Sequence, residues 1–115
     1  MKQNNLKINQ EARKIAKVVA EKYKPEKIIL YGSVARGDIR KNSDIDLCII
    51  KKTKLPFRKR IWKVYNLIRN VDYDYGLEPI IFTPNEFTNK KKCNDFFVKN
   101  ILKDGKILYE TKKRQ

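Results

Sequence analysis

Two aspartates one residue apart constrain this chain more than any other feature of its sequence. Asp44 and Asp46 open the segment DIDLCII, which is otherwise entirely apolar. In a β-strand, residues two apart point to the same face of the sheet, so this segment predicts a strand with acids on one face and Ile45 and Leu47 on the other. Two carboxylates this close repel each other, and bound divalent cations would turn the repulsion into coordination. The alternative is a strand end that simply exposes two aspartates.

A glycine and a serine follow the preceding apolar run and favour an anion-binding junction. The run from Glu26 to Tyr31 predicts a buried strand, and Gly32 and Ser33 come directly after it, where a short helix is expected to begin. Backbone amides at such a junction face an anion, and glycine lets a phosphate approach the backbone closely. By itself, however, Ser33 is equally compatible with an ordinary N-cap.

The rest of the chain predicts helices and strands in one domain over residues 1–115. Apolar residues at helical spacing predict helices over 9–24 and 55–70, with a last helix near 94–103. A third strand is expected in GLEPIIFTP, with Pro79 near its start, followed by a helix start at Thr83 and, later, a short KILYE segment. The fold class is therefore α/β (α+β), and a flexible basic tail is expected over 111–115.

The residue types that are absent exclude several kinds of chemistry. The chain has no histidine, and its two cysteines, Cys48 and Cys93, lack the CxxC spacing. A zinc site or a thiol–imidazole pair therefore cannot be assembled. Cys48, within an apolar run, is expected in the core. No apolar run has the length of a membrane span or a secretory signal, so we expect a cytoplasmic protein without a membrane partner.

The chain is strongly basic, which favours polyanionic partners. Lys and Arg number 28 against 13 Asp and Glu, a formal net charge of +15. Nucleic acid, nucleoside triphosphates or an acidic protein would all match this charge. The basic clusters are KKTK (51–54), RKR (58–60), KKK (90–92) and TKKR (111–114). They predict a basic rim, although a merely solvated, solubilising surface has the same composition.

The spacing of the glycine, serine and aspartates resembles a family signature. Gly32-Ser33, ten residues, then Asp44-x-Asp46 resembles the GSx10DxD motif of nucleotidyltransferases of the DNA polymerase β superfamily. Ala35-Arg36-Gly37 and Ser43 resemble the form typical of its minimal nucleotidyltransferase (MNT) branch. The resemblance is detailed over residues 27–51. It implies a polymerase β-like nucleotidyltransferase fold, a small mixed sheet flanked by helices, with the acids on the sheet.

The resemblance also implies a role for each motif residue. Gly32 and Ser33 would hold the β- and γ-phosphates of a nucleoside triphosphate, and Arg36 would lie near them. Asp44 and Asp46 would coordinate two Mg²⁺ ions. The reaction would be an in-line attack by an acceptor oxygen on the α-phosphorus of ATP, with pyrophosphate leaving.

The family usually adds a third acid on a later strand, and here the sequence leaves alternatives open. Glu78 is the first candidate for this catalytic metal ligand because it begins an apolar strand. It departs from the family in being a glutamate, and Pro79 is expected to distort the strand start. Asp74 and Asp72 compete for the role, and a missing third acid is the remaining possibility.

Four aromatic residues are candidates for stacking on a nucleotide base. Trp62 and Tyr65, at helical spacing, are expected in the core or a covered groove. Tyr73 and Tyr75 lie in a polar connector beside the expected third acid. Contact with the incoming base or the acceptor is the functional alternative for these two.

The MNT resemblance implies an antitoxin that transfers AMP to a tyrosine of a cognate HEPN-domain toxin, as in type VII toxin–antitoxin systems. One alternative is a non-catalytic module that binds a toxin or RNA through its basic surface. Another is a nucleotidyltransferase acting on a small molecule such as an aminoglycoside. The sequence leaves open the nucleotide, the acceptor and the oligomeric state.

Overall fold

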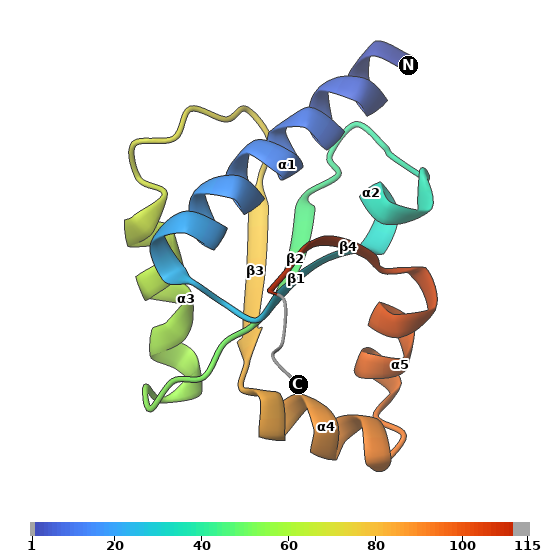
Figure 1. Ribbon diagram of the computed structural model, residues 1–115. Coiled ribbons are helices and arrows are strands. Elements are labelled where there is room, and N and C mark those ends of the chain that lie inside the picture. Colours follow the sequence, from blue (N-terminus) through green and yellow to red (C-terminus); the bar gives the residue numbers. More distant parts are fainter. Residues whose placement is uncertain (1, 112–115) are drawn as a thin grey trace.

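The computed structural model describes residues 2–111, which form a sheet with helices on both faces (Figure 1). The elements in chain order are α1 (Lys2–Tyr23), β1 (Lys27–Tyr31), α2 (Gly32–Arg36), β2 (Ile45–Ile50), α3 (Phe57–Leu67), β3 (Leu77–Phe82), α4 (Pro84–Lys92), α5 (Phe96–Asp104) and β4 (Lys106–Glu110). The expected α/β class is confirmed. The first helix begins earlier than its apolar periodicity predicts, and KILYE is a strand.

The four strands form a mixed sheet in the order β3-β2-β1-β4. β1 pairs antiparallel with both β2 and β4, whereas β2 and β3 are parallel. β3 is an edge strand, which accommodates Pro79 because a strand edge does not need every N–H. The β2–β3 register runs without a shift from Ile45 opposite Leu77 to Ile50 opposite Phe82. The expectation that Pro79 distorts the strand start was therefore wrong.

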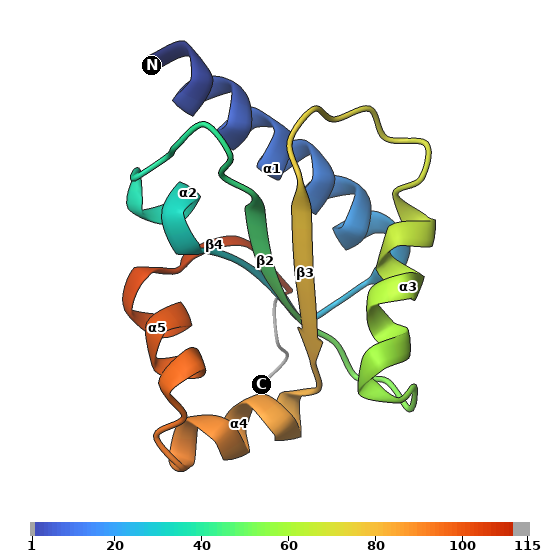
Figure 2. The same cartoon turned by 180° about the vertical axis from the view of Figure 1, so that it is seen from behind.

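Alternation along the strands produces two cores, one on each face of the sheet. The larger core lies under α1 and α3 and includes Ile15 and Val64 from the helices and Leu47 from β2. The smaller core lies under α5 and includes Cys48 and Ile101. The expected burial of Cys48 is thus confirmed. In Figure 2, where α1 lies behind the sheet, β2 and β3 face the viewer and α2, α5 and α4 lie around them.

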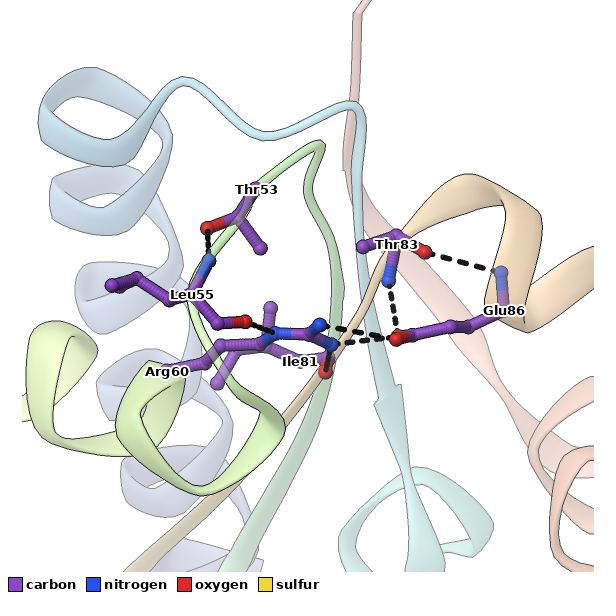
Figure 3. A network of polar contacts seen from close by, with 6 residues as sticks. All are labelled: Thr53, Leu55, Arg60, Ile81, Thr83 and Glu86. Atoms are coloured by element: carbon purple, nitrogen blue, oxygen red, sulfur yellow. Dashed lines mark hydrogen bonds and ion pairs between the residues drawn. The ribbon is translucent and has the colours of Figure 1, made fainter.

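A buried arginine joins α3 to β3 and α4 (Figure 3). Arg60 is 5% exposed, and its guanidinium donates to both carboxylate oxygens of Glu86 at 2.6 and 3.0 Å. It also donates to the backbone oxygens of Ile81 (3.1 Å) and Leu55 (3.0 Å). Glu86 completes a capping box with Thr83, as the expected helix start at Thr83 requires. One charged pair therefore fixes the positions of three elements.

Two further expectations concern the C-terminal tail and the length of the helices. Of the basic tail over 111–115, residues 112–115 lie outside the described residues. The amide of Thr111 donates to the carbonyl oxygen of Glu26 at 2.9 Å. Within residues 2–111, none of the helices is long and apolar enough to cross a membrane.

Replacing Arg60 should destabilise the fold. Arg60→Ala leaves the Glu86 carboxylate and two backbone oxygens without their donor, and loss of one partner of a buried pair costs about 3 kcal/mol. Urea denaturation should show this loss in the free energy of unfolding. Arg58→Ala, at an exposed position of the same helix, is the matched control and should change the stability by less than about 0.5 kcal/mol. Equal effects of the two substitutions would contradict the assignment.

Candidate active site

Three carboxylates from two parallel strands meet at one end of the sheet. Asp46 lies directly opposite Glu78 in the β2–β3 register, and Asp44 immediately precedes β2. Asp44 is also close enough to Glu78 to be the first cause of the raised pKa of Glu78. On β2, Asp46 is two residues from Cys48 and therefore points to the same face of the sheet, the face covered by α5. Glu78, opposite Asp46 on β3, points to this face as well. The structure therefore brings together all three acids for which the sequence predicts a catalytic role.

Two glycines allow the backbone to pack against these carboxylates. A Cβ on Gly32 would collide with the Asp46 carboxylate, and a Cβ on Gly76 would collide with that of Asp44. Gly32 also has a φ of +77°, a conformation that L side chains rarely adopt. Gly76 was missed by the sequence analysis, although its place directly before the third strand was a usable signal. The carboxylates of Asp46 and Asp44 thus occupy space that a side chain at position 32 or 76 would fill.

The pKa values of Asp46 and Glu78 are both raised. Burial, and then the neighbouring Asp44, raise the pKa of Asp46 to about 6, while Arg36 partly opposes the shift. The hydrogen bond with Asp44, burial and the charge of Asp46 together raise the pKa of Glu78. The cluster is therefore deficient in positive charge, which a divalent cation would supply.

The donor chemistry of the cluster fits Mg²⁺, which prefers carboxylate oxygens. Because Gly32 and Gly76 have no side chain, their backbone lies close to the carboxylates of Asp46 and Asp44, as a compact ion site requires. In the part of the chain that is described, no three acidic or thiol side chains are already spaced as a metal-binding group. Binding of a metal ion would therefore require these carboxylates to change rotamer.

A basic pocket lies beside the acids at the start of α2. The pocket has a volume of about 480 Å³ and is lined by Ser33, Arg36, Asp38, Arg40, Lys41, Asn42 and Ser43. The Ser33 hydroxyl donates to the Ser43 hydroxyl at 3.3 Å, and the latter accepts from the Arg40 amide at 2.7 Å. The N-cap position of α2 is Tyr31, without a side-chain cap, so the N-cap interpretation of Ser33 is wrong. Its hydroxyl instead faces the pocket loop.

Arg36 lies at the edge of this pocket and is half-exposed. Its guanidinium is 3.8 Å from the Asp104 carboxylate, a long ion pair that leaves other donors of the guanidinium available. The expected position of Arg36 near a bound phosphate is compatible with this geometry.

The competing third acids are placed differently from Glu78. The Asp74 carboxylate accepts from the Lys7 ammonium at 2.6 Å, and this hydrogen bond lowers the pKa of Asp74. Asp72 is exposed, and its backbone oxygen accepts from Lys14. Both contacts are made to α1. The register places Glu78, and not these aspartates, opposite Asp46.

A buried glutamate in α1 holds the loop that leads into β3. Glu11 is 7% exposed, and its carboxylate accepts from the amides of Asp74 (2.9 Å) and Tyr75 (3.3 Å). The loop then ends at Gly76, whose carbonyl oxygen accepts from Ile45 at 2.8 Å. The sequence analysis missed Glu11, although a carboxylate beside Ala12 in the apolar stripe of a helix was a signal for it. Glu11 therefore positions the loop that contacts Asp44.

The four aromatic residues that the sequence offers as base-stacking candidates lie outside the carboxylate cluster. Trp62 is 70% exposed, so its expected burial was wrong: α3 buries Arg60 and Val64 on the opposite side of the helix. Tyr65 is partly buried and donates its hydroxyl to the Leu77 oxygen at 2.6 Å. Tyr73 and Tyr75 pack against the larger core, on the sheet face opposite the acids. This position argues against the alternative in which Tyr73 and Tyr75 contact the base.

The comparison with known families agrees with this geometry. The sequence profile of the family described as "Polymerase beta, Nucleotidyltransferase" matches residues 13–114. The chain belongs to this nucleotidyltransferase family. Its membership confirms the resemblance and the enzyme class expected from Gly32-Ser33 and Asp44-x-Asp46.

Two curated relatives come from Methanocaldococcus jannaschii. The family member described here is 34% identical over 84 residues to the protein named "Putative protein adenylyltransferase MJ0604", covering 73% of this chain and 78% of that one. It is 36% identical over 63 residues to "Putative protein adenylyltransferase MJ0141", covering 53% of this chain and 63% of that one.

Two solved structures share the fold of this nucleotidyltransferase. A crystal structure described as a putative nucleotidyltransferase from Sulfolobus solfataricus superposes with a TM-score of 0.66 at 20% identity, covering 96% of this chain and 87% of that one. A toxin–antitoxin structure with AMP-PNP gives a TM-score of 0.60 at 23% identity, covering 88% and 74%. At these identities the similarity establishes the fold.

The raised pKa of Asp46 predicts a pH-dependent stability. The folded protein binds this proton more tightly than the unfolded chain, because the pKa is about 6 instead of 3.8. The carboxyl therefore stabilises the fold below pH 3.8, and this contribution is lost as the pH rises through about 6. In EDTA at pH 7.5, Asp46→Asn should be more stable than wild type by about 1–2 kcal/mol, after allowance for solvent screening.

Urea denaturation at pH 4 and pH 7.5 measures this effect. The gain should disappear at pH 4, and the exposed control Asp72→Asn should show little change at either pH. A gain of equal size at both pH values would refute the role of ionisation.

Proposed function

We propose that the chain is a Mg²⁺-dependent nucleotidyltransferase that transfers AMP from ATP to a protein, a tyrosine of a cognate HEPN-domain toxin. The observation that carries the proposal is the register that places Glu78 opposite Asp46, with Asp44 just before the start of β2. A relative named as a protein adenylyltransferase supports the protein acceptor. The toxin–antitoxin structures among the fold neighbours, one with AMP-PNP, support the toxin and the donor.

In this proposal the basic pocket holds the leaving end of the donor. Gly32, Ser33 and Arg36 bind the β- and γ-phosphates, and the nearby cationic groups of Arg40 and Lys41 compensate the charge that develops on pyrophosphate.

The acids bind and orient the reacting groups. Asp44, Asp46 and Glu78 would hold two Mg²⁺ ions, which when bound supply Lewis-acid stabilisation of the entering and departing oxygens. The acceptor hydroxyl oxygen forms a bond to the α-phosphorus and releases its proton to solvent, as the bond to the bridging oxygen of pyrophosphate breaks and pyrophosphate leaves. Glu78, on the edge strand and exposed, lies on the side from which a protein acceptor can approach.

A transfer assay tests the proposed activity. Purified protein, Mg²⁺, α-labelled ATP and a HEPN-domain toxin from the same genome should yield a labelled toxin. The variant Asp44→Ala/Asp46→Ala should lower the rate by at least about 100-fold, because both proposed metal ligands on β2 are lost. Asp72→Ala, which alters an exposed carboxylate outside the cluster, is the control and should transfer normally. Undiminished labelling by the double variant would refute the mechanism.

The identity of the third acid is tested with three further variants. Glu78→Gln should lower the transfer rate by about 10- to 100-fold, because the amide keeps the shape but not the charge of a metal ligand. Glu78→Asp, which restores the residue usual in the family, should retain part of the activity. Asp74→Asn should behave like wild type. Loss of activity in Asp74→Asn alone would assign the role to Asp74 instead.

A further inference from the structure

Helix α3 lies in a segment of the chain that has no acidic residue. Residues 47–71 contain eight lysines and arginines and neither aspartate nor glutamate. The helix lies at the side of the molecule, beyond the edge strand β3 (Figure 1, Figure 2), and packs against β3 and α1. It buries Arg60 and Val64 on its inner side. The outer side of α3 is therefore a basic surface that faces solvent.

This outer side presents three cations around a tryptophan. Arg58, Lys59 and Lys63 are exposed, as is Trp62. Residues three or four apart are neighbours on a helix surface, so Arg58 and Lys59 flank Trp62 from the preceding turn. Among residues 2–111, none of the three cations forms an ion pair with a carboxylate. Their charges are therefore available to the phosphates of a polyanion.

Trp62 is held beside a second aromatic ring. Its side chain is 70% exposed, and its ring lies at 59° to that of Tyr65, with centroids 6.5 Å apart. Tyr65 is anchored, because its hydroxyl donates to the Leu77 oxygen at 2.6 Å. The indole is thus a large flat surface that is exposed to solvent and supported from one side.

The composition of this surface favours a nucleic acid over an acidic protein. Strong protein-docking sites have aromatic anchors in a well-packed centre from which water is excluded. Here the apolar neighbour Val64 is buried inside, and the exposed neighbours of Trp62 are charged. Aromatic rings among cations are typical of single-strand binding, in which a base stacks on the ring and the cations contact the backbone.

We propose that the outer side of α3 binds single-stranded nucleic acid, with a base stacked on Trp62 and phosphates bound by Arg58, Lys59 and Lys63. Bases within a duplex stack on one another, so their faces are accessible in a single strand. The inference goes beyond the transfer of AMP. Helix α3 covers the larger core, on the face of the sheet opposite the acids, and the binding requires neither ATP nor a toxin.

Fluorescence of Trp62 tests the stacking directly, because it is the single tryptophan of the chain. Titration with an oligouridine of about 12 nucleotides, a length within the range of single-strand sites, should quench the emission. EDTA is present, so that no metal ion can link a phosphate to the acids. Oligothymidine of the same length shows whether DNA serves as well as RNA. A duplex of this length should leave the emission nearly unchanged.

Variants measure what the ring contributes. Anisotropy of a labelled oligouridine reports the affinity without relying on the tryptophan. Trp62→Ala should weaken binding about five- to 100-fold, because stacking on the ring is lost. Trp62→Phe keeps a ring and should retain most of the affinity. Phe96→Ala is the matched control, since Phe96 is a 77% exposed aromatic residue of another helix, and it should bind like wild type.

A second pair of variants measures what the local charge contributes. Lys59→Gln/Lys63→Gln should weaken binding and reduce the slope of log affinity against log salt by about 1.4, because two phosphate contacts are lost. Lys99→Gln/Lys103→Gln removes the same charge from an exposed pair with the same spacing on α5. This control should keep the wild-type slope. Circular dichroism should show that all variants are folded, because the changed side chains are exposed.

Four outcomes would overturn the proposal. The first is a wild-type protein that binds neither oligonucleotide. The second is undiminished binding by Trp62→Ala, and the third is an equal loss in the two lysine double variants, which would reduce the effect to net charge. The fourth is equal quenching by poly-glutamate, which would assign the outer side of α3 to an acidic protein. None of these results bears on the transfer of AMP, which the labelling assay tests separately.

Discussion

The parallel pairing of β2 and β3 is the constraint on which the candidate site depends. It places Asp46 and Glu78 at the same level of the sheet, with Asp44 beside them. Parallel strands require a crossover connection, which here is α3 and the loops around it. Arg60 fixes this crossover at one end of β3 through Glu86 and the Ile81 carbonyl. At the other end, Glu11 fixes the loop. Contacts at both ends of β3 thus fix its register against β2.

Stability and function make opposite demands at the acid end of the sheet. Burial of like charges raises the pKa values of Asp46 and Glu78, which is a cost to the folded state at neutral pH. The larger core under α1 and α3 offsets it, since that face buries apolar residues from three strands. Gly32 and Gly76 add a steric requirement, because side chains there would displace the carboxylates. Local destabilisation of this kind is common where binding sites are preorganised.

The two faces of the sheet consequently have different roles. The face under α1 and α3 is closed and holds the fold together. The other face is only partly covered by α5, and at one end of it lie the carboxylates of Asp46 and Glu78.

The sequence by itself determined what depends on local spacing. Short apolar runs located the first three strands, Thr83 marked a helix start, and Gly32-Ser33 with Asp44-x-Asp46 identified the family, because these signals lie within short segments of the chain. Only the tertiary structure decided which later acid faces Asp46, since Glu78, Asp74 and Asp72 all carry carboxylates and only Glu78 lies in the strand paired with β2. It also revealed the contacts of Glu11 and Gly76 and the exposure of Trp62. These properties depend on which distant segment packs against a residue, and no local pattern encodes that.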